Sequence, residues 1–195
     1  MNVTRLIICS TVFILAGCTP SYTLVGPGSV PVSKKAISVT PHSAWNRIPP
    51  QPNATKWQES WTQNGPLLDV ITFVGGLPSG AALSKQKEKD DRKVPEFNPQ
   101  MTPDDLVSMI EASYRVGGVN LFELTSVEPV IFLGSDGIKL DYSFVADDSL
   151  KRRGRCVLSV VQDKLYLIKL EGATNHYFDT ALPEFNAMLD SAALR

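Results

Sequence analysis

The chain has 195 residues, of which 43% are hydrophobic and 20% are charged, and its formal net charge is −1. A chain of this length can bury the apolar core of one ordinary domain. A general nucleic-acid binder is clearly basic, so the near-zero charge argues against that class of function. We therefore expect one globular domain and no nucleic-acid partner.

The first residues have the pattern of an export signal. Arg5 supplies a positive charge, an apolar run follows over residues 6–15, and two small residues precede Cys18. The run is too short to cross a bilayer, which takes about 20 apolar residues. The pattern predicts a cleaved signal peptide over residues 1–17. Two alternatives remain, an ordinary secretory peptide with an incidental cysteine or a short buried helix, and either would leave a soluble protein.

The four residues Leu15-Ala16-Gly17-Cys18 resemble the lipobox of bacterial lipoproteins. The resemblance implies that the Cys18 thiol carries a diacylglyceryl group, whose acyl chains hold the protein to a membrane surface. In Gram-negative families a residue other than Asp after this cysteine favours the outer membrane, and here that residue is Thr19. We therefore expect a lipid-anchored protein on the periplasmic face of the outer membrane.

The segment that follows the cysteine differs in composition from the rest of the chain. Residues 18–41 are rich in Pro, Gly, Ser and Thr and show little periodicity. Such a composition predicts a flexible tether, so we place the globular domain at residues 42–195.

The first part of the domain predicts two strands joined around Asn64-Gly65, where turn residues separate two apolar segments. The second strand, over residues 67–74, is apolar on both faces and should be central in a sheet. Residues 76–100 then contain glycines, prolines and the charged run 85–93, which predict a long mobile loop.

A helix is expected from Thr102, a typical N-cap residue, with Pro103 in the first helical position. Gly117-Gly118 should end it. Alternating apolar residues then predict four strands joined as hairpins, and a second amphipathic helix should begin at about Thr180. The strands are expected at residues 121–133, 138–145, 155–161 and 165–170. Hairpins imply antiparallel pairing, so the sequence predicts an α+β fold, an antiparallel β-sheet covered by amphipathic helices as an αβα sandwich.

The C-terminal part resembles the last strand and helix of the PsbP/Mog1-like fold. The resemblance lies in the apolar run 165–170 followed by Tyr177, Phe178, Phe185 and Leu189-Asp190-Ser191. It implies an antiparallel sheet between helices and a binding or assembly module rather than an enzyme. No catalytic set is common to that family, so the resemblance implies no site residue.

Few side chains could support catalysis or metal binding. His42 and His176 do not stand at a metal-ligand spacing, and no cofactor motif is present, so we expect neither metal nor cofactor. Cys156, the one cysteine outside the signal and the lipobox, lies in an apolar run and is expected in the core. A nucleophile paired with His176 and Asp179 is the alternative, and it would give a small periplasmic hydrolase.

The basic cluster Lys151, Arg152, Arg153 and Arg155 is the candidate binding site. Four cations so close together could bind an anionic lipid or an acidic patch on an envelope protein. A solvated strand end, neutralised in part by Asp147 and Asp148, is the alternative interpretation. With a predicted anchor and no catalytic motif, the sequence favours a non-catalytic binding or envelope-assembly module.

Overall fold

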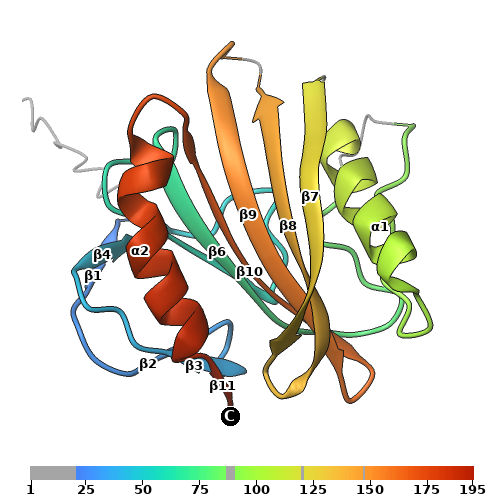
Figure 1. The fold of residues 1–195 in the computed structure, drawn as a ribbon, viewed down its shortest axis with the longest axis horizontal. Coiled ribbons are helices and arrows are strands. Elements are labelled where there is room, and N and C mark those ends of the chain that lie inside the picture. The colour runs from blue at the N-terminus through green and yellow to red at the C-terminus, as the bar shows by residue number, and fades with distance from the viewer. Residues whose placement is uncertain (1–20, 87–90, 120, 147) are drawn as a thin grey trace, which may run out of the picture.

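The computed structural model describes residues 21–86, 91–119, 121–146 and 148–195. Strands contribute more residues than helices to the described chain, and two helices pack on them (Figure 1). In chain order the elements are β1 (Thr23–Val25), β2 (Val30–Val32), β3 (Ile37–Val39), β4 (Trp45–Arg47), β5 (Gln58–Thr62), β6 (Asp69–Leu77), α1 (Pro103–Val116), β7 (Leu121–Phe132), β8 (Ser135–Val145), β9 (Lys151–Val161), β10 (Lys164–Ala173), α2 (Tyr177–Asp190) and β11 (Ala193–Leu194).

The main sheet has eight strands in the order β1-β4-β5-β6-β10-β9-β8-β7, and every neighbouring pair is antiparallel. Strand β10 is central, between β6 and β9. A second, small sheet has the order β11-β3-β2. The antiparallel pairing predicted from the hairpins is confirmed.

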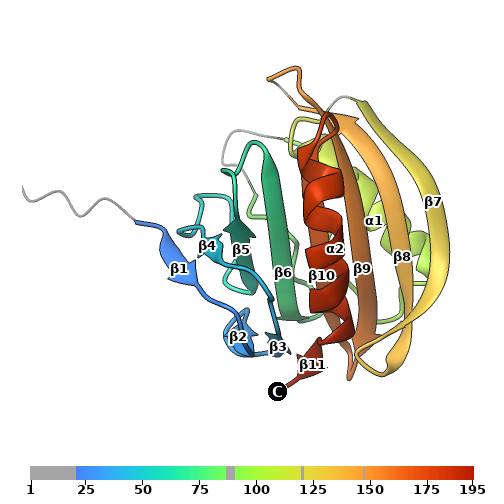
Figure 2. The same ribbon diagram turned by 60° about the vertical axis from the view of Figure 1, so that its left-hand side comes forward.

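The two helices pack against opposite faces of the main sheet (Figure 2). Side chains alternate between the faces along each strand, so Val157 packs in the cluster of α2 while Cys156 and Leu158 pack in the cluster of α1. Helix α1 contacts β7 and β8, whereas α2 contacts β6, β9 and β10. On the face of the sheet that α1 covers, strands β5 and β6 are therefore left to be covered by loops.

Helix α1 begins as predicted. Thr102 caps it, because its hydroxyl accepts from the Asp105 amide at 3.2 Å while the Asp105 carboxylate accepts from the Thr102 amide at 2.9 Å. Pro103 is the first helical residue and Gly117 the C-cap. Sequence analysis placed the start of the last helix at about Thr180, but it begins at Tyr177, because Phe178 joins the buried face of the helix.

The expected tether is wrong over residues 23–39. These residues form β1, β2 and β3, and Val32, Ile37 and Val39 have no exposed surface. Several of the glycines and serines that predicted a tether lie in turns between these short strands, although Ser38 lies within β3. Ser33 and Lys34, for example, adopt positive φ angles of 49° and 58° between β2 and β3.

Two other strand boundaries differ from the prediction. The β7–β8 turn lies at Leu133 and Gly134, both with positive φ, so residues 135–137 belong to β8 rather than to the turn. Strand β9 begins at Lys151 and includes the whole basic cluster, which apolar alternation alone does not mark as a strand.

Gly75 and Gly76 lie within β6 and not in the loop predicted after it. A Cβ atom on Gly75 would lie 2.7 Å from the Cβ of Ala36, so glycine is what lets the β2–β3 turn pack there. The two ends of the loop are joined, since the Gly80 amide donates to the Phe97 carbonyl and Phe97 is buried. Residues 87–90 of the charged run lie outside the described residues, so its mobility stays a prediction.

Candidate functional site

A cavity of about 660 Å³ opens on the α1 face of the main sheet, and we call it the sheet-face cavity. Strands β5, β6, β9 and β10 contribute its floor, and its walls come from α1 and from residues 47–56 and 83–85. It lies where α1 does not cover the sheet. Its volume falls within the range of about 300–1,000 Å³ that is typical of small-molecule sites.

Polar groups lie on the floor of this cavity. Ser60 and Thr72 are cross-strand partners on β5 and β6, and their hydroxyl oxygens lie 3.1 Å apart. In the wall, Oγ1 of Thr55 is buried and has no hydrogen-bond partner among the described residues. Buried polar groups are normally hydrogen-bonded, so the Thr55 hydroxyl is available to a ligand or to water.

Lys169, on the central strand β10, is the charged group at the floor. Its Nζ donates to the Tyr114 hydroxyl at 2.9 Å and forms an ion pair with Glu171 at 2.9 Å. The Tyr114 hydroxyl also donates to Glu171 and lies 2.7 Å from that of Tyr142. Burial, and then the charge of Glu171, raises the pKa of both tyrosines well above the ordinary value. Both hydroxyls therefore stay protonated, and that of Tyr114 holds the Lys169 ammonium together with Glu171.

The lining of the sheet-face cavity is basic, although the chain as a whole has a net charge of −1. Among the lining residues five are basic: Lys34, Arg47, Lys56, Lys85 and Lys169. Glu59 is the one acidic lining residue in the described part of the chain, and it pairs with Arg47 at 2.7 Å. The cavity thus brings several basic side chains together with apolar ones.

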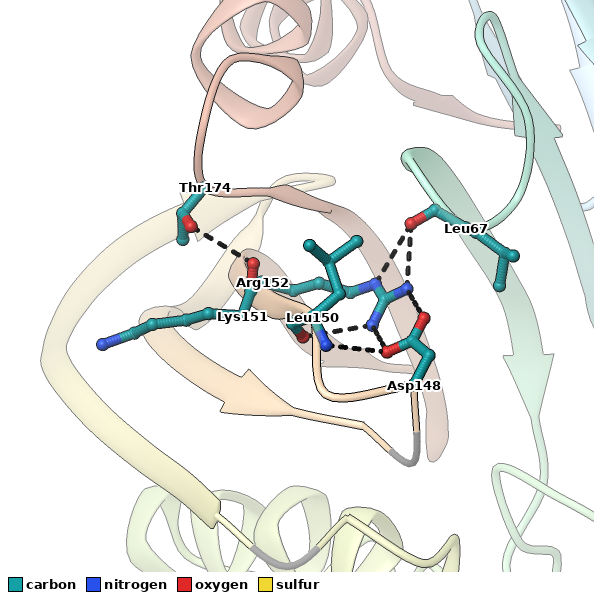
Figure 3. Close-up of polar contacts among 6 residues, drawn as sticks. All are labelled: Leu67, Asp148, Leu150, Lys151, Arg152 and Thr174. Carbon is teal, nitrogen blue, oxygen red and sulfur yellow. Dashed lines mark hydrogen bonds and ion pairs between the residues drawn. The ribbon is translucent and has the colours of Figure 1, made fainter.

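The basic cluster predicted as the binding site does not form one patch. All four residues lie on β9, where alternation places Arg152 on the α1 side and the other three on the α2 side. Arg152 is only 7% exposed. It donates to both carboxylate oxygens of Asp148, at 2.9 and 2.5 Å, and to the Leu67 carbonyl at 2.9 and 3.2 Å (Figure 3). Arg152 thus joins the β8–β9 turn to the segment before β6.

The other arginines of the cluster are also paired. Arg153 forms an ion pair with Asp179 at 2.8 Å and lies over the Phe178 ring. Arg155 donates to both oxygens of Asp141, at 2.7 and 2.8 Å. The Lys151 carbonyl accepts from the Thr174 hydroxyl (Figure 3). Each of the three arginines is thus paired with an aspartate, as the strand-end alternative expects of Asp148, whereas the Lys151 contact involves only its backbone carbonyl. Asp147 lies outside the described residues.

The remaining candidates lie apart from the sheet-face cavity or in the core. His42 is near Glu184, and His176 contacts Thr180. In the described ranges, no three His, Cys, Asp or Glu side chains are grouped so that they could hold a metal ion. Cys156 has no exposed surface, which confirms the core interpretation, and burial raises the pKa of its thiol.

The sheet-face cavity could not be predicted from the sequence, because its residues come from distant segments. One local signal was present. Lys169 and Glu171 lie on the same face of β10 as the buried Leu165 and Leu167, at every second position of a largely apolar strand. Charged side chains on the buried face of a strand need polar partners or contact with water. Lys169 and Glu171 have the Tyr114 hydroxyl as a partner, and Lys169 also lines the cavity.

Comparison with known proteins shows a likeness of fold. The solution structure of cyanobacterial PsbP (CyanoP) from Synechocystis sp. PCC 6803 matches with a TM-score of 0.55 and 14% identity, covering 94% of this chain and 98% of the other. A Bacteroides thetaiotaomicron structure matches with a TM-score of 0.52 and 6% identity over 88% of this chain and 49% of the other. A variant of the protein Mog1 matches with a TM-score of 0.50 and 10% identity over 87% and 96%.

These matches confirm the PsbP/Mog1-like resemblance at the level of fold, and they extend it from the C-terminal part to most of the chain. Identities this low carry no residue from one protein to another. No protein-family model and no curated protein sequence matches the chain.

Proposed function

We propose that the chain is a non-catalytic binding module of the cell envelope, with its ligand site in the sheet-face cavity. The carrying observation is the cavity of about 660 Å³, which combines apolar side chains with the fixed Lys169 ammonium and with the Thr55 hydroxyl, which has no hydrogen-bond partner among the described residues. A few polar groups placed in an apolar hollow are the usual composition of a small-molecule site. We take the fold to be one αβα-sandwich domain of the PsbP/Mog1 kind.

The proposal includes a lipid anchor on Cys18, on the periplasmic face of the outer membrane. Its support is the lipobox pattern over residues 15–18, which lies outside the described residues. In the described ranges, none of the helices is long and apolar enough to span a bilayer. An anchored module would present the cavity to ligands near the membrane surface.

The described geometry gives the hydrolase alternative no support. Asp179, one partner proposed for His176, is engaged by Arg153 at 2.8 Å. Cys156, the candidate nucleophile, is fully buried on the face opposite to α2, and the residues that line the cavity in the described ranges include neither histidine. A nucleophile needs a base within hydrogen-bond reach.

Two measurements test the proposal separately. Replacing Cys18 with Ser should release the protein from membranes or leave an uncleaved precursor, and mass spectrometry should find the wild-type cysteine acylated. An unmodified cysteine on a mature chain would refute the anchor and leave the cavity untouched.

The cavity is tested by filling it. Ser113 of α1 lines the sheet-face cavity, and Ser108 of the same helix is exposed and does not. Ligands found by NMR screening should shift the amide signals of Ser60 and Thr72, and Ser113→Trp should abolish the shifts while Ser108→Trp preserves them. Ligands that bind Ser113→Trp unchanged would place the binding site elsewhere.

A further inference from the structure

Resting on the proposed function, we infer that the sheet-face cavity takes an amphipathic anion, a molecule with a carboxylate or phosphate head and an apolar body. Cations without a carboxylate partner and apolar side chains occupy different parts of the lining.

Two of the five basic lining residues are already neutralised. Arg47 pairs with Glu59 at 2.7 Å, and Lys169 pairs with Glu171 at 2.9 Å. They contribute hydrogen-bond donors to the cavity but little net charge.

The other three, Lys34, Lys56 and Lys85, are exposed and lie at the cavity mouth. Across the residues that the structure describes, none of their ammonium groups forms an ion pair with a carboxylate. Lys56 Nζ lies over the Trp57 ring, and Lys85 Nζ reaches only the Pro52 carbonyl, at 3.4 Å. Three cations around one opening attract an anion and repel one another without it.

Most of the remaining lining is apolar, beside the polar groups of the floor. Its larger apolar side chains are Ile48, Val74, Leu83, Ile110, Val119 and Leu167. Val74 and Leu167 come from the sheet and Ile110 from α1, and all three are buried. Such a surface favours hydrocarbon over water. A small inorganic anion would leave this surface unused, and a neutral hydrocarbon would leave the three lysines unused.

An amphipathic anion matches both parts in one orientation. Its apolar body would lie along Val74, Ile110 and Leu167, and its head would face the lysines at the mouth. A fatty-acid carboxylate and a lipid phosphate share this chemistry.

Binding should be measured by calorimetry on the full chain carrying Cys18→Ser, with decanoate, decyl phosphate, 1-decanol and inorganic phosphate as probes. Decanoate and decyl phosphate should bind and shift the Ser60 and Thr72 amide signals. The tighter of the two identifies carboxylate or phosphate as the preferred head. We expect 1-decanol to bind roughly tenfold more weakly, which corresponds to about 1.4 kcal/mol, and inorganic phosphate alone to leave the signals unchanged.

Lysine variants separate the head group from the body. Lys34→Gln combined with Lys56→Gln and Lys85→Gln should weaken decanoate roughly fivefold or more, in line with the modest strength of exposed ion pairs, and should leave 1-decanol unchanged. Lys35→Gln is the matched control, because Lys35 is exposed in the same turn as Lys34 but does not line the cavity. Added salt should reduce decanoate affinity in the wild type more than in the triple variant.

The outcomes distinguish this inference from the proposed function. Equal affinity of the cavity for 1-decanol and decanoate would refute the requirement for an anionic head group, and the proposal of a binding module would stand. If inorganic phosphate bound as tightly as decyl phosphate, the claim that the ligand has an apolar body would be refuted. Binding of no amphiphile would overturn the inference, while the Ser113→Trp comparison still decides whether the cavity binds another ligand.

Discussion

Gly154 lies directly opposite Tyr142 on strands β9 and β8, and the Tyr142 ring covers it. A Cβ atom on Gly154 would lie 2.2 Å from two carbons of that ring. Because Gly154 has no side chain, Tyr142 lies flat over the sheet and its hydroxyl reaches that of Tyr114 at 2.7 Å. A glycine inside the basic cluster therefore helps to fix the network that holds Lys169.

Gly154→Ala should destabilise the protein by about 1–3 kcal/mol, because the added methyl group must displace a buried aromatic ring. Urea unfolding measures the loss. Gly26→Ala is the control, since a Cβ atom there meets nothing within 4 Å, and it should change stability by less than about 0.5 kcal/mol. Similar stability of the two variants would show that Tyr142 can move without cost.

The elements that sequence analysis predicted well carry local signals. Thr102 and Pro103 mark the start of α1, and the alternation over residues 138–145 marks β8, because capping and strand burial depend on residues close in sequence. The sheet-face cavity carries no such signal. Thr72 and Lys169 become neighbours only through the pairing of β6 with β10, which a single sequence does not specify.

The strands between residues 23 and 39 were missed for a related reason. Each has three residues, too few for a periodic pattern, and they are stable only because Ile37 and Val39 pack in the same cluster as Met188 of α2. Composition alone gives such a segment the character of a linker. The basic cluster is a different case, since its four cations alternate between two faces, and two of its arginines are paired by aspartates distant in sequence, Arg153 by Asp179 and Arg155 by Asp141.

The correction to the tether can be measured. Ile37 is fully buried, so Ile37→Ala should cost about 2–5 kcal/mol by leaving a cavity in the core. Leu24, in strand β1 of the same N-terminal segment, is 71% exposed, and Leu24→Ala should change stability by less than about 0.5 kcal/mol. A tether would make both changes neutral, so an unaltered urea midpoint for Ile37→Ala would restore the original prediction.

Cys156 should resist thiol reagents in the native state. It has no exposed surface, and burial raises the pKa of its thiol, so little reactive thiolate forms. Labelling by a bulky maleimide, followed by mass spectrometry on the Cys18→Ser chain, should be slow in buffer and fast in urea. Rapid labelling in buffer would mean that the cavity floor opens far enough to admit the reagent.

The Asp148 carboxylate should make the free energy of unfolding depend on pH in the acidic range. Hydrogen bonds from Arg152 lower the pKa of the Asp148 carboxyl from 3.8 to about 2 in the folded protein. A carboxyl whose pKa is lower in the folded state stabilises it above its ordinary pKa, and that contribution is lost as the pH falls through the folded-state value. The contribution of Asp148 should therefore be complete above 3.8, diminish below that pH and vanish below about 2.

The test compares wild type with Asp148→Asn by urea unfolding at several pH values between about 2 and 6. The difference in unfolding free energy should be constant at the upper end and shrink toward zero at the lower end. Arg152→Met removes the donor, so in that background Asp148→Asn should lose this dependence on pH. If the difference kept the same pH profile without Arg152, the lowered pKa would have another source, and the contact between the β8–β9 turn and Leu67 would not depend on the carboxylate.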